Sequence, residues 1–100
     1  MSSRTFILKK SDLPQKKFSV TDISTGKTIH FGAKGYEDYT LSKDKVKKAN
    51  YIARHAPREN FEDLSTAGSW SRYILWSRPT IKQSVQDMQK RFNIKIINMI

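Results

Sequence analysis

The sequence contains no cysteine, and only three prolines and four glycines interrupt its 100 residues. The absence of cysteine excludes disulfides and the cysteine-based zinc and iron–sulfur sites. No apolar run approaches the roughly 20 residues that a membrane helix requires, and Met1–Lys10 lacks the apolar core of a signal peptide. We therefore expect a soluble, intracellular protein without a membrane span.

Acidic residues are also scarce, since 9 Asp and Glu stand against 19 Lys and Arg and give a formal net charge of +10. The excess lies at the two ends: residues 1–35 and 64–100 each carry +5, whereas residues 36–63 are neutral. A charge so far from zero favours a polyanionic partner or an acidic protein surface. The length suits one small core, so we expect a single basic domain spanning residues 1–100.

The first third of the sequence has the pattern of β-strands. Thr5–Leu8 is a short apolar run that ends before a turn-prone segment containing Pro14. Phe18–Ile23 alternates apolar with polar residues, and a turn containing Gly26 separates it from Thr28–Phe31. The two runs predict a β-hairpin.

A first helix is expected to begin at Ser42 as N-cap, with Asp44 near the positive end of the helix dipole, and to end at Pro57. Helical spacing predicts that one thin apolar stripe faces the core: Val46, Ala49, Ile52, Ala53 and Ala56. The opposite face collects Lys47, Lys48, Tyr51, Arg54, His55 and Arg58. Such a face suits phosphate binding or base stacking, and it also suits an ordinary solvated helix.

Two further helices and a strand complete the expected fold. The first spans Gly68–Ser77 after a cap at Ser65 or Thr66. The second has Pro79 in its first turn, carries its apolar residues at 81, 85, 88 and 92, and closes at Asn93 before a strand over Ile94–Ile100. We predict an α+β domain in which the hairpin and terminal strands form a small antiparallel or mixed sheet, with about three helices packed on one face. We expect Trp70 and Ile74 in the core and Trp76 partly exposed.

No catalytic constellation is evident in the sequence. His30 and His55 lack metal-ligand spacing to a third donor, and the nucleophile-elbow and phosphate-loop motifs are absent. We therefore expect no enzyme activity, no metal and no cofactor. The remote alternative is a metal-dependent nuclease that uses Asp38, Asp44 and Glu59 beside Lys47.

Three stretches carry a resemblance to a known family: Phe31–Thr40 (FGAKGYEDYT), Tyr51–His55 (YIARH) and Thr66–Trp76 (TAGSWSRYILW), the last followed by Pro79-Thr80. The pattern resembles an uncharacterised family of small basic proteins of nucleocytoplasmic large DNA viruses, over roughly residues 17–92. Ser69 stands where that family typically has an aromatic residue. The resemblance implies a viral origin and a virion component, and it implies no catalytic residues.

These observations lead to two main hypotheses. The first is a viral structural protein, a minor capsid component that docks on other virion proteins and is found in the virion and in the host cytoplasm or nucleus. The alternative is a packaged protein that binds nucleic acid non-specifically. The predicted contacts to nucleic acid or an acidic partner are Lys9, Lys10, Lys16, Lys17, Lys47, Lys48, Tyr51, Arg54 and Arg58. The predicted contacts to a protein partner are Arg72, Leu75 and Trp76. The sequence leaves the oligomeric state open.

Overall fold

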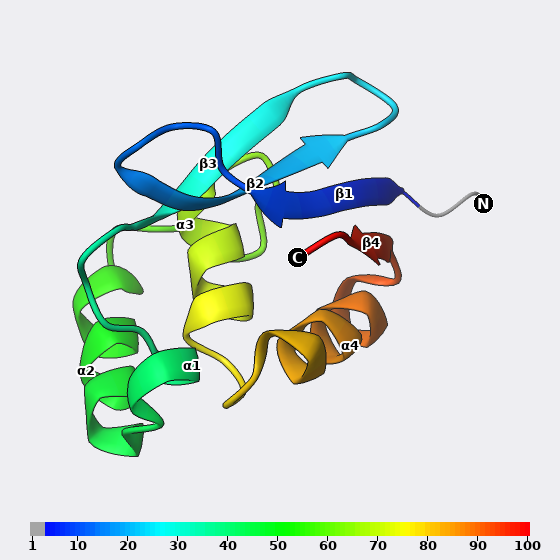
Figure 1. Ribbon diagram of the computed structural model, residues 1–100. Coiled ribbons are helices and arrows are strands. Elements are labelled where there is room, and N and C mark those ends of the chain that lie inside the picture. Colours follow the sequence, from blue (N-terminus) through cyan, green and yellow to red (C-terminus); the bar gives the residue numbers. More distant parts are fainter. Residues whose placement is uncertain (1–3) are drawn as a thin grey trace.

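A four-stranded mixed sheet forms one layer of the protein (Figure 1). The computed structural model describes residues 4–100. The strands are β1 (Thr5–Lys10), β2 (Lys16–Asp22), β3 (Thr28–Ala33) and β4 (Lys95–Asn98), in the spatial order β3-β2-β1-β4. The pairs β1–β2 and β2–β3 are antiparallel, and β4 joins β1 in parallel. The predicted hairpin and the predicted terminal strand are both confirmed.

The helices pack on one face of this sheet (Figure 1). They are α1 (Tyr39–Ser42), α2 (Lys45–His55), α3 (Ala67–Trp70) and α4 (Ile81–Phe92), and a π-helical segment, η1 (Ser71–Leu75), continues α3. The predicted α+β class is confirmed, with four helices where about three were expected. Within residues 4–100, no helix is long and apolar enough to cross a membrane.

The start of α2 differs from the prediction. Asp44, and not Ser42, caps α2, because its carboxylate accepts hydrogen bonds from the backbone N–H groups of Val46 and Lys47. Ser42 is instead the last residue of α1, a short helix that no periodic pattern in the sequence predicts. Lys43 separates the two helices in the left-handed conformation, with φ 54°.

The other helix ends lie close to where the sequence places them. Thr66 caps α3 through the N–H of Ser69, as one of the two predicted caps. Thr80 caps α4, so Pro79 lies before the helix and not in its first turn as predicted. Asn93 closes the helix in the left-handed conformation.

The apolar stripe predicted for α2 does not face the core. Val46 is 69% exposed, and Ala49, Ala53 and Ala56 are exposed as well. The helix instead buries Tyr51, which the sequence places on the solvated basic face. Tyr51 is buried because its ring stacks on Trp76 and its hydroxyl donates to Ser71, contacts that the alanines of the stripe cannot make. Ile52 is the one stripe residue that is partly buried.

The core forms between the sheet and the helices around Trp70. This side chain is fully buried, its ring meets Phe6 edge-on at a centroid distance of 4.9 Å, and its indole N–H donates to the Leu64 carbonyl at 2.9 Å. Ile74 is also fully buried, so the expected core positions of Trp70 and Ile74 are confirmed. Leu75 is only 2% exposed and belongs to the same core. This burial leaves Leu75 little surface for the predicted contact with a protein partner.

Candidate binding cleft

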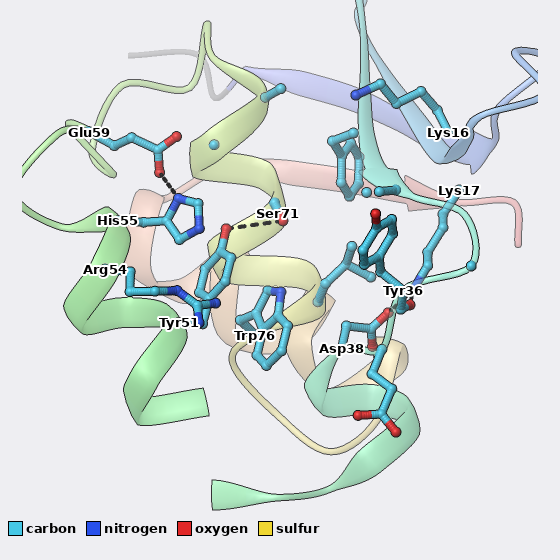
Figure 2. Close-up of a pocket in the computed structure, with 18 residues that line it drawn as sticks. Lys16, Lys17, Tyr36, Asp38, Tyr51, Arg54, His55, Glu59, Ser71 and Trp76 are labelled. Atoms are coloured by element: carbon cyan, nitrogen blue, oxygen red, sulfur yellow. Dashed lines mark hydrogen bonds and ion pairs between the residues drawn. The ribbon is translucent and has the colours of Figure 1, made fainter. Parts of the chain in front are cut away.

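A cleft of about 690 Å³ opens beside the core (Figure 2). One wall consists of α2 and the α3–η1 helix, and the other consists of the start of β2 and the loop that joins β3 to α1. Its volume lies within the range typical of small-molecule sites, roughly 300–1,000 Å³. All three stretches that carry the family resemblance contribute to its lining.

A stack of three aromatic rings forms the helical wall. Trp76 lies parallel to Tyr51, with centroids 4.6 Å apart and planes inclined by 6°, and His55 lies on the other side of Tyr51 at 4.3 Å. The spacing of four residues on α2 places Tyr51 and His55 one above the other. The Tyr51 hydroxyl donates to Ser71 Oγ at 3.2 Å, and burial raises the pKa of this tyrosine above its ordinary value.

The opposite wall carries Tyr36 on an anchored loop. Lys17 Nζ donates to the Tyr36 carbonyl and to Asp38 Oδ2, both at 2.6 Å. Asp38 is 2% exposed and also accepts a hydrogen bond from the Thr40 N–H, which caps α1. The backbone of Tyr36 is thereby fixed, although the residue is 73% exposed.

A histidine–carboxylate pair lies at the α2 end of the cleft. His55 Nδ1 and Glu59 Oε2 are 3.5 Å apart, one helical turn from each other in sequence. Glu59 Oε2 is inaccessible to solvent and has no hydrogen-bond partner among the described residues. The other carboxylate oxygen occupies the space that a Cβ on Gly68 would need, at 2.4 Å, so glycine permits this close approach. The pair can fix the orientation of the His55 ring.

Most of the positive charge has no carboxylate neighbour. Five of the 19 Lys and Arg side chains form ion pairs with Asp or Glu, which leaves 14 without one among residues 4–100. Two of these 14, Lys16 and Arg54, line the cleft on its opposite walls. The lining also contains Glu37, Asp38 and Glu59, so the cleft mixes positive and negative groups, and Lys16 and Arg54 are the lysine and arginine of the lining that have no ion-pair partner among residues 4–100.

The structure brings together part of the predicted set. Lys16, Lys17, Tyr51, Arg54, Leu75 and Trp76 all line the cleft. Trp76 is partly exposed, as expected. Lys9, Lys10 and Arg58 are exposed outside the cleft lining, and Lys47 pairs with Glu37.

Two of the predicted cations point inward and hold the chain after η1. Lys48 Nζ donates to the Ser77 carbonyl at 2.6 Å, and Arg72 donates to the Trp76 carbonyl at 2.8 Å. Burial lowers the pKa of both groups, and the Arg72 guanidinium lowers that of Lys48 further. Both cations cap the negative end of the α3–η1 helix.

The lining residues Tyr36 and Ser71 are not among the predicted site residues, whereas His55 is predicted on the basic face of the first helix and Glu59 only for the nuclease alternative. His55 lies on α2 four residues after Tyr51, and Glu59 follows four residues later, beyond the end of the helix. No local pattern marks Tyr36 or Ser71, whose positions depend on tertiary structure.

The carboxylates of the nuclease hypothesis have separate structural roles. Asp38 pairs with Lys17 and caps α1, Asp44 caps α2, and Glu59 lies beside His55. Among residues 4–100, no group of three or more His, Cys, Asp or Glu residues could hold a metal ion. The proposed trio of ligands is therefore wrong.

The protein is a small basic α+β domain with an aromatic cleft that both cations and carboxylates line. The chain belongs to a family of unknown function, DUF5754, which matches residues 6–55. The matched half spans β1 to α2 and contributes the Tyr36 loop and the Tyr51–His55 segment of the cleft. No curated protein and no solved structure matches the chain. The resemblance to viral proteins stays a prediction.

Proposed function

We propose that the protein binds nucleic acid, with the cleft as the contact surface. The observation that carries this proposal is the pair Lys16 and Arg54, which face the cleft from opposite walls without a carboxylate partner among the described residues. Cations that lack internal partners are available to backbone phosphates, and each contact releases counterions from the nucleic acid. Such contacts position a strand and carry no sequence information.

The net charge of +10 supports the same proposal, because it attracts a polyanion from a distance and raises the association rate. Phosphate binding of this kind requires no metal and no cofactor. The exposed Lys9, Lys10 and Arg58 extend the positive surface beyond the cleft.

The test is the salt dependence of binding to a short single-stranded oligonucleotide. For single strands, the logarithm of the binding constant falls with the logarithm of salt concentration by about 0.7 for each phosphate neutralised. Lys16→Gln and Arg54→Gln should each reduce this slope by about 0.7. Lys82→Gln, which removes the same charge from the exposed face of α4, should leave the slope unchanged. An absence of binding at low salt, or an unchanged slope in both cleft variants, would refute the proposal.

The second candidate is a viral structural protein that docks on other virion proteins. It is favoured by exposed apolar side chains on the two neighbouring helices α1 and α2, where Leu41 is 65% and Val46 is 69% exposed. Isolated exposed apolar residues are common, but neighbouring ones often contact a partner. Purified virus particles should contain the protein in fixed stoichiometry and retain it after release of the genome. Its absence from the particles would exclude this role.

A further inference from the structure

The cleft combines its cations with an exposed aromatic ring, and we propose that it binds a single strand by stacking one unpaired base on Tyr36. This inference rests on the proposed function and narrows it to single-stranded nucleic acid. It assigns the base to Tyr36 and the flanking phosphates to Lys16 and Arg54.

Tyr36 has the properties of a stacking platform. It is 73% exposed, the most exposed of the large hydrophobic residues among residues 4–100. Its backbone is nevertheless held by Lys17, which also binds the buried Asp38. A tyrosine on an anchored loop offers a large amphipathic surface and loses little conformational entropy when a ligand binds.

The surroundings of Tyr36 suit a flat ligand. Figure 2 shows its ring on the opposite side of the cleft from Tyr51 and Trp76. Phe31 and Leu75 also border the cleft, but they are only 1% and 2% exposed, so the aromatic surface open to a ligand belongs mainly to Tyr36 and Trp76. A base can therefore stack on the exposed ring of Tyr36 while its phosphates stay near Lys16 and Arg54.

Stacking on Tyr36 requires a base with an uncovered face, and this requirement distinguishes single strands from duplexes and from acidic peptides. In a duplex both faces of each base are covered by neighbours, whereas a single strand can present a base to an aromatic side chain. An acidic peptide would meet the cations, but its charged side chains carry no aromatic ring that could stack on Tyr36. The combination of rings and cations is therefore best used by single-stranded nucleic acid.

Tryptophan fluorescence of the full chain provides the measurement, because Trp76 lines the cleft whereas Trp70 is fully buried in the core and gives a constant background. Four probes are titrated at low salt: oligo-dT, an abasic oligomer of the same length, a duplex of the same length, and polyglutamate. We expect oligo-dT to quench Trp76 and to bind at least about tenfold more tightly than the abasic oligomer, a difference of about 1.4 kcal/mol.

Two variants isolate the ring. Tyr36→Ala should weaken binding of oligo-dT by roughly 5- to 150-fold, the range that corresponds to base–aromatic stacking of roughly 1–3 kcal/mol, and should leave the abasic oligomer unaffected. Tyr36→Phe keeps the ring and should bind like the wild type. Circular dichroism checks that both variants stay folded, which the exposure of this side chain leads us to expect.

The possible failures are distinguishable. If Tyr36→Ala binds oligo-dT as the wild type does, or if duplex and abasic oligomer bind as tightly as oligo-dT, the stacking inference is wrong and general nucleic-acid binding survives. If none of the nucleic acids binds at low salt, the proposed function itself fails. Polyglutamate that binds and displaces oligo-dT would assign the cleft to an acidic protein partner instead.

Discussion

Replacement of Asp38 by asparagine tests how the cleft is held in place. The carboxylate is 3% exposed and accepts from Lys17, itself only 14% exposed, at 2.6 Å. Asparagine keeps an oxygen for the Thr40 N–H and is itself a good helix cap, so the variant removes the charge and preserves the cap. In the variant, the largely buried ammonium of Lys17 faces the neutral amide of the introduced asparagine in place of a carboxylate.

The expected loss of stability is about 3 kcal/mol. Removal of one partner from a buried ion pair costs roughly 3–5 kcal/mol, because the other charge stays buried without compensation. We expect the lower end of this range, since Lys17 retains some exposure and its bond to the Tyr36 carbonyl. A domain of this size has a total stability of roughly 5–15 kcal/mol, so Asp38→Asn should still fold.

Urea unfolding followed by circular dichroism measures this loss, and a double-mutant cycle assigns it to the pair. Lys17→Met has no ammonium that the loss of Asp38 could leave unpaired. In this background Asp38→Asn should lower the free energy of unfolding by less than about 1 kcal/mol. The cycle should therefore return a coupling free energy of at least about 2 kcal/mol. A loss below about 0.5 kcal/mol in the wild-type background, within the usual range of a surface substitution, would refute the view that this pair anchors the Tyr36 loop.

Two further predictions concern stability. Gly32→Ala should destabilise the protein more than Gly26→Ala. Both glycines have positive φ, so each alanine carries a backbone cost of roughly 1–2 kcal/mol, but a Cβ at Gly32 would also lie 2.8 Å from Leu75 Cδ1, whereas Gly26 faces open space. Equal losses of stability in urea unfolding would contradict this prediction. The hydrogen bond from Arg4 lowers the pKa of Asp22 below its ordinary value of 3.8. The ionised Asp22 therefore contributes its full stabilisation above pH 3.8 and loses it as the pH falls through the lowered pKa. Asp22→Asn should make the stability less sensitive to acid in unfolding curves between about pH 5 and pH 2, and an unchanged pH profile would contradict the assignment.

The sequence predicts those elements whose signal is local. The hairpin has alternating strands on both sides of a turn at Gly26, and this glycine adopts the positive φ of 74° that such a turn requires. Helix α4 repeats its apolar residues at the helical period and carries its stop at Asn93. In both cases the propensity, the period and the end signals agree, and they suffice to define the element.

The orientation of α2 could not be predicted in the same way. Three of the five residues in its apolar stripe are alanines, each of which buries little surface, whereas the ring of Tyr51 has two aromatic neighbours, Trp76 and His55. Tyr51 stacks on Trp76, which lies 25 positions later in the chain and directly after η1. A contact of that range is set by the packing of α2 against η1, which no local pattern encodes.

The same dependence on distant contacts explains why the sequence gives only part of the cleft. The sequence identifies the cations of the cleft because charge is visible in the composition. The role of Tyr36 depends on Lys17 and Asp38, whose contacts hold its loop in place.

The sheet, by comparison, offers little for a partner at its β4 edge. Gln89 Oε1 accepts from the Ile96 N–H at 2.8 Å, and Asn98 Oδ1 accepts from the Ile100 N–H at 3.0 Å. Because side chains already occupy these edge donors, strand addition is disfavoured, and the cleft on the helical side is the surface better suited to a ligand.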